Sequence, residues 1–481
     1  MKIDFDRLLF RRQYIIGPKA FHPNENWDYL NINNNLILSV HRDLPYAIDK
    51  NDQKLTIFIG LGFDPFHPDY DEQAILSTLN KQDISSLIKS TYPIAGRWSI
   101  VFQENAKTYL FTDPCGYRQV FYYSDGCQSW CASQPELIKA NCLLTYNTDE
   151  NLHEFIASPE FSQQESAWIG SETIYQNCFH LLPNHYLIFN NNQQVRFYPN
   201  TPLLINETPK IIEETSETLK GILAAIANRS QIALALTSGW DSRLLLAASK
   251  DLFPKVKGFI DRKGTMPKDH PDLIIATKLA KKLNLDFEIK NSSISPPGWF
   301  ISLLSTNVTS ARVLSKTNMI YSRYIDQEDV IFVNGNCGEI FRNYYDRYCQ
   351  EDINKISVEK IVSLLGYKGK QTYIRREIEK WKNDFEINKQ MGWNLLDFLY
   401  WEQRLGNWGA QFPAEEDIAA DEISPLNCRL LIDTLLSSPR EERSAPEYKI
   451  IRKLIHSLLP EALDFPFNPK KRQRLFKIEC Y

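Results

Sequence analysis

A stretch near the middle of the chain has the residue types of an anion-binding turn. An apolar run ends at the sequence TSGWDS, Thr237–Ser242, and apolar residues then return at helical spacing. A strand that turns directly into a helix places backbone N–H groups at the helix N-terminus, where they bind phosphate, and hydroxyls add donors. Asp241 could hold Mg²⁺ beside that phosphate. The alternative is a helix capped by Ser or Thr with an acidic first turn.

A second apolar run, residues 329–333, also ends in a turn of small residues that carries a carboxylate, VNGNCGEIF. The carboxyl ends of parallel strands share one edge of a sheet, so Asp241 and Glu339 are expected to face the same crevice. Two carboxylates there can hold Mg²⁺ against a phosphate group. We therefore predict Asp241 and Glu339 as metal ligands. The alternative for Glu339 is a solvated carboxylate at the start of a helix.

The elements that must position these turns change in type near residue 205. Before it, short β-branched and aromatic runs predict strands, followed by a polar connector at 200–210. After it, strands at 231–236, 256–260, 286–289 and 329–333 alternate with helices such as 270–283, which predicts a parallel sheet covered by helices. From about residue 346 the segments look mainly helical. The strands expected in the first part are 54–62, 96–103, 107–113, 119–124 and a hairpin at 184–199.

Length and composition narrow the class of protein. A chain of 481 residues exceeds one ordinary core, so we predict two domains, 1–205 and 206–481. The net charge of −4 argues against broad nucleic-acid binding, and no apolar run reaches the roughly 18 residues that span a bilayer. The charged N-terminal stretch predicts no secretory signal. Nine scattered cysteines without zinc spacing indicate reduced thiols and a cytoplasmic protein.

Both turns resemble motifs of the asparagine synthetase family of ATP pyrophosphatases. TSGWDS resembles the family's S-G-G-x-D-S loop, with Thr in place of Ser and Ser in place of the first Gly. Four residues match the S-G-x-G-G-D-E-x-F segment: Gly335, Gly338, Glu339 and Phe341. The resemblance implies ATP and Mg²⁺ as cofactors and an α/β parallel-sheet domain with a helical C-terminal extension. The nucleotide-binding residues that it implies are Thr237, Ser238, Gly239, Asp241, Ser242, Asp272 and Gly335.

Asp272 stands where this family has an aspartate at the head of its second helix, near the purine or ribose side of the nucleotide. The alternative is an acidic side chain that complements the helix dipole.

Residues 95–124 resemble the glutamine amidotransferase domain of the same family, which implies an αββα sandwich of the N-terminal nucleophile type. Three residues stand at recognisable places: Asp113, Gly116 and Arg118. A working glutaminase of this type needs an N-terminal cysteine whose own α-amine activates the thiol. Here Lys2 follows Met1, and the first cysteine is Cys115. We therefore expect a degenerate domain that does not release ammonia from glutamine.

The resemblance implies one chemistry: a carboxylate attacks the α-phosphate of ATP, pyrophosphate leaves, and an amine attacks the acyl-adenylate. We predict an amide-bond-forming synthetase acting on small-molecule or peptide carboxylates and amines, in the biosynthesis of a specialised small molecule, peptide or modified glycan. Family members such as β-lactam synthetases and lasso peptide cyclases use an amine of the same substrate. The alternative is a catalytically degenerate pseudo-synthetase that serves as a binding or scaffold subunit. The sequence is also compatible with a homodimer.

Further side chains are candidates for catalysis. In the family a lysine near the C-terminal end stabilises developing negative charge, and Lys470 and Lys471 in FNPKKRQRLFK, or Lys449, could do so here. The alternative for the first two is a solvated basic tail. Glu402 could act as a base and Arg404 could bind a substrate carboxylate. For this pair the alternative is an ion pair within one helix.

Overall fold

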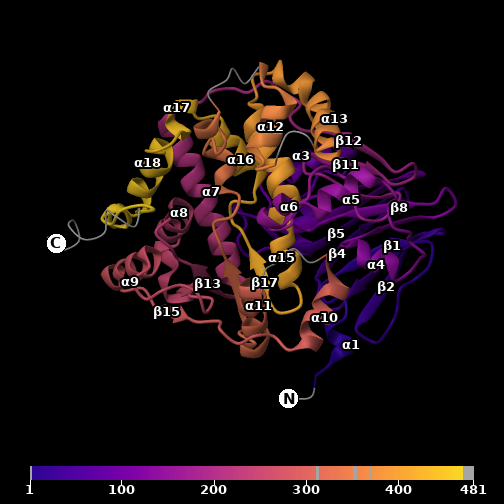
Figure 1. Cartoon of the computed structure of the whole chain (residues 1–481), viewed down its shortest axis with the longest axis horizontal. Coiled ribbons are helices and arrows are strands. Elements are labelled where there is room, and N and C mark those ends of the chain that lie inside the picture. Colours follow the sequence, from indigo (N-terminus) through magenta and orange to yellow (C-terminus); the bar gives the residue numbers. More distant parts are fainter. Residues whose placement is uncertain (1–2, 310–313, 350–354, 368–370, 470–481) are drawn as a thin grey trace.

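The computed structural model describes residues 3–309, 314–349, 355–367 and 371–469. In Figure 1 the indigo and purple strands of the N-terminal half lie beside the helices and parallel strands of the C-terminal half. Within the described residues, every helix is too short or too polar to cross a bilayer.

The N-terminal half is built, over its described part, from two six-stranded antiparallel sheets. The first has the order β10-β8-β9-β1-β3-β2 and the second the order β12-β11-β7-β6-β5-β4. The first contains β1 (Tyr14–Gly17), β2 (Trp27–Asn33), β3 (Leu36–His41), β8 (Phe121–Ser124), β9 (Ser129–Ala132) and β10 (Cys178–His180). The second contains β4 (Tyr46–Lys50), β5 (Lys54–Phe63), β6 (Ala95–Glu104), β7 (Lys107–Thr112), β11 (His185–Ile188) and β12 (Gln193–Arg196).

The two sheets pack face to face, with helices outside. Ile16 and Leu38 of the first sheet share one buried cluster with Ile57 and Leu187 of the second. Helices α2 (Glu72–Thr78) and α3 (Ile84–Ser90) cover the outer face of the second sheet, and α4 (Pro135–Lys139) covers that of the first. A layered sandwich is therefore present in outline. Its relation to the N-terminal nucleophile class stays a prediction.

The C-terminal half contains the predicted parallel sheet, in the order β15-β14-β13-β16-β17. Its strands are β13 (Gln231–Ala235), β14 (Val256–Asp261), β15 (Phe287–Lys290), β16 (Val330–Val333) and β17 (Asp421–Ile423). The central strands are short runs of Ile, Leu, Val and Ala, as expected where both faces of a sheet are covered. Strand β17 was not expected, because the segments after residue 346 had been predicted mainly as helices.

Helices make up most of the rest of this half. The longest, α7, begins at Thr208 within the predicted connector, and Leu219, Ile222 and Ile226 form its buried face. The others are α8 (Trp240–Ala248), α9 (Pro271–Leu283), α10 (Gly298–Asn307), α11 (Leu314–Asp326), α12 (Val358–Leu364), α13 (Thr372–Lys389), α14 (Leu395–Phe398), a π-helical segment (Leu399–Gly409), α15 (Ala410–Glu416), α16 (Arg429–Leu436), α17 (Arg440–Arg443) and α18 (Lys449–Leu458). The sheet type changes close to the predicted boundary at residue 205, although the boundary itself stays a prediction.

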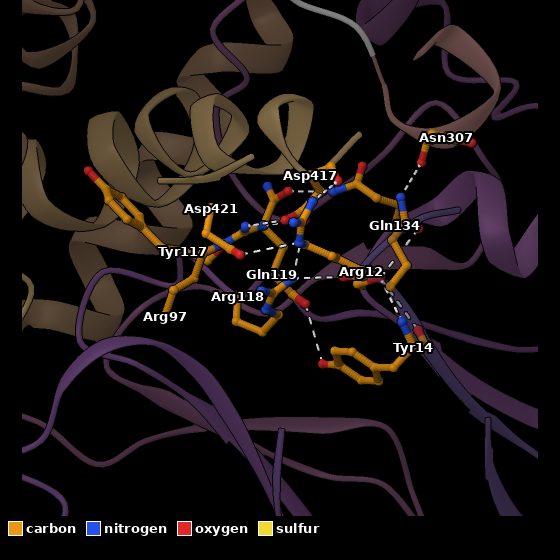
Figure 2. Close-up of polar contacts among 12 residues, drawn as sticks. Arg12, Tyr14, Arg97, Tyr117, Arg118, Gln119, Gln134, Asn307, Asp417 and Asp421 are labelled. Carbon is orange, nitrogen blue, oxygen red and sulfur yellow. Dashed lines mark hydrogen bonds and ion pairs between the residues drawn. The ribbon is translucent and has the colours of Figure 1, made fainter. Parts of the chain in front are cut away.

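A buried network of arginines around Asp417 joins the two halves (Figure 2). Arg97 donates to both carboxylate oxygens of Asp417 at 2.6 and 2.7 Å, and Arg118 lies 3.2 Å from one of them. Arg12 donates to the backbone carbonyl of Asp417 at 2.8 Å and lies 3.3 Å from Asp421. Arg97, Arg118 and Asp417 are each at most 3% exposed. One carboxylate therefore holds two buried guanidinium groups from the other half.

The three residues that resemble the amidotransferase domain, Asp113, Gly116 and Arg118, support the structure of this region. Asp113 accepts hydrogen bonds from the backbone N–H groups of Tyr117 and Arg118 and from the Asn427 side chain of the other half. Gly116 has φ +67°, a left-handed conformation that favours glycine. Arg118 belongs to the Asp417 network. These contacts account for the residue types without any catalytic role.

Asp433 lies where the two halves meet, and we expect it to make the stability of the protein depend on pH. Its carboxylate accepts a hydrogen bond from the Tyr198 hydroxyl, and burial raises its pKa to about 6, although Arg429 opposes the shift. Because the folded pKa lies above the ordinary value, the folded state favours the protonated carboxyl, and this contribution to stability is lost as pH rises from about 4 to about 6.

We expect Asp433→Asn, which cannot ionise, to gain melting temperature relative to the wild type as pH rises through that window. The gain at pH 8 corresponds to at most about 3 kcal/mol. Thermal melting at pH 4.5 and pH 8 measures the difference. The exposed Asp251 on the surface serves as a control, because Asp251→Asn should show no such trend. A constant offset between Asp433→Asn and the wild type would contradict the prediction.

Candidate active site

The turn Thr237–Ser242 connects β13 to α8 and is held together by its own hydroxyl groups. The N–H of Thr237 donates to Oγ of Ser242 at 3.2 Å, and the N–H of Gly239 donates to Oγ1 of Thr237 at 3.1 Å. The two hydroxyl oxygens lie 3.0 Å apart. Thr237 and Ser242 therefore fix the shape of the turn, and the small residues leave room for the close approach of the backbone.

Asp272 contacts this turn directly. It lies near the start of α9, and its Oδ1 accepts hydrogen bonds from both the N–H and the hydroxyl of Ser238. His270, the residue that caps α9, lies 3.6 Å from the other oxygen of Asp272. Ser238 therefore provides a hydroxyl that donates to Asp272. A role of Asp272 at the purine or ribose side of a nucleotide stays a prediction.

The structure brings Asp241 and Glu339 to one guanidinium group. The second turn follows β16 and leads into a short 3₁₀ helix, Gly338–Phe341, that carries Glu339. Nη2 of Arg342 lies 2.6 Å from Oδ2 of Asp241 and 2.7 Å from Oε1 of Glu339. The two carboxylates therefore meet as predicted for the ends of neighbouring parallel strands.

Burial and neighbouring charges shift the pKa values of the groups at this point. Burial raises the pKa of Asp241 to about 7, with Arg342 opposing the shift and Glu339 adding to it. The two carboxylates in turn raise the pKa of Arg342, against the effect of burial. Among the described residues there is no cluster of three or more His, Cys, Asp or Glu that could hold a metal. A Mg²⁺ ion would therefore take its remaining ligands from water and phosphate, as Mg²⁺ commonly does.

Glycines allow the second turn to pack on Asp241. A Cβ added at Gly335 would lie 2.5 Å from Cβ of Asp241, and one added at Gly338 would lie 2.1 Å from Oδ1 of Asp241. Real Cβ atoms do not come this close to a neighbour, so a side chain at either position would force Asp241 to move. Gly335 thus shapes the site around Asp241.

The segment before the two candidate lysines passes over the first turn. Phe467 stacks on Trp240 with ring centroids 3.6 Å apart, and the N–H of Asn468 donates to the carbonyl of Ser238 at 3.2 Å. Arg243 donates to the carbonyls of Phe465 and Pro466, both at 2.6 Å. Lys470 and Lys471 themselves lie outside the described residues. The chain nevertheless reaches the turn two residues before them.

Lys449 occupies the first position of α18, and its half-exposed side chain lies 3.8 Å from Glu447. The ring of its neighbour Tyr448 lies 5.6 Å from that of Trp240 and 5.3 Å from the Arg342 guanidinium. Lys449 therefore follows a residue that packs beside the candidate site, but its own ion-pair partner is the exposed Glu447. Its role in catalysis stays a prediction.

Glu402 is bound on all sides and lies in the π-helical segment with no exposed surface. Arg196 donates to its two oxygens at 2.6 and 2.8 Å, and further donors come from Asn184 and Trp381. These contacts give no support to the role of a base. The alternative of an ion pair within one helix is also wrong for Glu402, because its partner Arg196 lies in β12. The guanidinium of Arg404 stacks on Trp408 at 4.1 Å.

Two residues of the site were not predicted from the sequence: Arg342, and Phe467, which stacks on Trp240. Arg342 stands three residues after Glu339, a spacing that places both side chains on one face of a helical turn. That spacing was a usable signal. Nothing in the local sequence connects Phe467 with Trp240.

Comparisons with known proteins do not assign the chain to a family. No protein-family model matches the sequence, and no curated protein matches it. Among solved structures, the chain is similar to an NH3-dependent NAD synthetase from Campylobacter jejuni, with 14% identity, a TM-score of 0.23, and coverage of 41% of this chain and 94% of the other. It is also similar to a glutamine-dependent NAD+ synthetase from Acinetobacter baumannii, with 11% identity, a TM-score of 0.21 and coverage of 50% of each chain.

A third similar structure is a glutamine phosphoribosylpyrophosphate amidotransferase from B. subtilis, with 12% identity and a TM-score of 0.24, covering 74% of this chain and 83% of the other. Similarity at these TM-scores carries no argument about function.

Proposed function

We propose that the protein is an ATP- and Mg²⁺-dependent amide synthetase that adenylates a small-molecule or peptide carboxylate and passes the acyl group to an amine other than glutamine-derived ammonia. The observation that carries the proposal is that Asp241 and Glu339, at the ends of β13 and β16, reach the same cationic group. Two carboxylates converging beside the N-terminus of α8 are suited to a metal–polyphosphate ligand. The proposed product is a specialised small molecule, peptide or modified glycan, and a homodimer is compatible with this role.

Each residue has a defined task in this proposal. Asp241 and Glu339 would hold Mg²⁺, which would neutralise the charge of the leaving pyrophosphate. The N-terminus of α8 would bind phosphate oxygens through backbone N–H groups. Lys470 or Lys471 would place a cation near the adenylated carboxylate, since the segment before them lies on the turn. Substituting Lys470 and Lys471 one at a time and measuring pyrophosphate release would show which lysine acts.

We expect isothermal calorimetry with Mg²⁺ present to show ATP binding to the wild type, weakened at least about tenfold in Asp241→Ala. The reason is that Asp241 is the carboxylate around which both turns pack. Asp251→Asn, an exposed surface variant, should bind ATP like the wild type. A screen of candidate carboxylates for pyrophosphate release then identifies the acid. Absence of binding by the wild type at millimolar ATP, with substrate mixtures present, would contradict the proposed function.

A second candidate function is a pseudo-synthetase that acts as a binding or scaffold subunit. It is favoured by the hydrogen bonds of the first turn, because the N–H groups of Thr237, Ser238 and Gly239 all donate within the protein. Phosphate could take these donors only by replacing Ser242, Asp272 or Thr237 as acceptor. The calorimetry described above separates the two candidates, since a scaffold protein needs no ATP affinity.

A further inference from the structure

Arg342 lies where the predicted metal ligands converge. Its Nη2 contacts Oδ2 of Asp241 and Oε1 of Glu339, and its Nε lies 3.3 Å from the carbonyl oxygen of Gly338. The residue is only 8% exposed. The contact with Asp241 is a charge-assisted hydrogen bond, and the contact with Glu339 is an ion pair of similar length. One cationic nitrogen therefore bridges the same two carboxylates that a divalent ion would use.

The second turn packs more closely around Asp241 than the contact with Arg342 alone requires. Gly335 and Gly338 let the backbone pack against the Asp241 side chain, and within the described residues Oδ1 of Asp241 is buried and accepts no hydrogen bond. A buried carboxylate oxygen without a partner is costly and unusual. Arg342 satisfies Oδ2 and leaves Oδ1 available to a cation or a donor.

We propose that Arg342 competes with Mg²⁺ for Asp241 and Glu339, and that it moves to phosphate oxygens of the nucleotide when the ion binds. This inference rests on the proposed function for its second half, the transfer to phosphate. When both are ionised, the two carboxylates carry one more negative charge than the guanidinium neutralises. A bound divalent ion changes the net charge of this group from negative to positive. The guanidinium then gains more from contact with anionic phosphates than from carboxylates that the metal already neutralises.

The chemistry of arginine suits this exchange. Its planar guanidinium presents a fixed fork of donors that fits carboxylate and phosphate equally well, and it stays charged in both positions. Lysine shares the charge but lacks the fork. Arg342 therefore couples loading of the metal to binding of the polyphosphate.

The first arm of the test uses Mn²⁺ alone, with binding to the full chain measured by electron paramagnetic resonance and no nucleotide added. We expect Arg342→Met, which keeps the length and removes the charge, to bind Mn²⁺ at least about tenfold more tightly than the wild type. Arg342→Lys keeps the charge but not the fork, so it should raise Mn²⁺ affinity less than Arg342→Met does. The control Arg375→Met removes an exposed arginine paired with Glu359 and should leave Mn²⁺ affinity unchanged. Thermal melting establishes folding, and Arg342→Gln replaces Arg342→Met if the latter does not fold.

The second arm measures ATP affinity in Mg²⁺ by calorimetry. We expect Arg342→Met to bind ATP at least about tenfold more weakly than the wild type, even though its metal affinity has risen. Opposite changes in the two affinities are not expected from a residue that only supports the fold. Unchanged Mn²⁺ affinity in Arg342→Met would overturn the competition, and unchanged ATP affinity would overturn the transfer to phosphate. If no variant and no wild type binds ATP while Mn²⁺ affinity rises, the proposed function fails and the competition stands.

Discussion

Asp417→Asn should destabilise the protein by about 3 to 5 kcal/mol, the cost expected when a buried ion pair loses one partner. Asparagine keeps the size of the side chain and removes its charge. Arg97 and Arg118 are both nearly fully buried, so in the variant two guanidinium groups would face each other without a counter-ion. Because the arginines come from one half and Asp417 from the other, the loss should weaken the attachment of the halves. Chemical unfolding of the two proteins in urea measures the difference.

The matched control is Asp251→Asn, which breaks an exposed ion pair with Lys220. We expect its stability to change by less than about 0.5 kcal/mol, as is usual for surface substitutions. If Asp417→Asn unfolds at the same urea concentration as this control, the charge of Asp417 does not hold the two halves together.

Glu339→Gln should lower substrate-dependent pyrophosphate release at least about 10²-fold, or about 2.7 kcal/mol in the activation free energy, while the melting temperature stays close to that of the wild type. Glutamine keeps the size and part of the hydrogen bonding of Glu339 but cannot neutralise a metal ion. The side chain is 29% exposed and its partner Arg342 keeps its contact with Asp241, so folding should lose no more than about 0.5 kcal/mol.

The matched control for this variant is Glu214→Gln on the exposed face of α7, where Glu214 pairs weakly with Lys210. Both variants remove one negative charge. Only the substitution at Glu339 should change turnover. A Glu339→Gln protein with normal turnover, or one that melts far below the wild type, would show that Glu339 supports the turn and does not act on the ligand.

The meeting of Asp241 and Glu339 could be predicted because topology fixes it. Both residues follow apolar strands, and β13 and β16 are parallel neighbours, with Ile232 opposite Ile331 and Leu234 opposite Val333. Strands paired in this register end at the same edge of the sheet, so the turns after them lie side by side. The parallel sheet was predicted from the same alternation of strands and helices, and the structure confirms it.

The partners of buried charges could not be predicted, because they come from distant parts of the chain. Glu402 looked like a candidate base, but its ion-pair partner Arg196 is 206 positions away. Asp417 gives no local signal for its contact with Arg97, which is 320 positions away. A pattern of residue types shows which side chains carry charge. Only the packed fold decides which of these charges are neutralised inside the protein and which remain available to a ligand.

The stack of Phe467 on Trp240 also bears on the order in which the site is completed during synthesis. Arg243 and Phe465, a bonded pair beside that stack, are separated by 222 positions in the chain. A ribosome delivers the N-terminal part of a chain first, so the turn emerges long before the segment that lies on it. Until then the indole of Trp240 and the guanidinium of Arg243 lack these partners. In a nascent chain the turn therefore lacks its contacts with the C-terminal segment, and a chain cut before Phe465 would never form them.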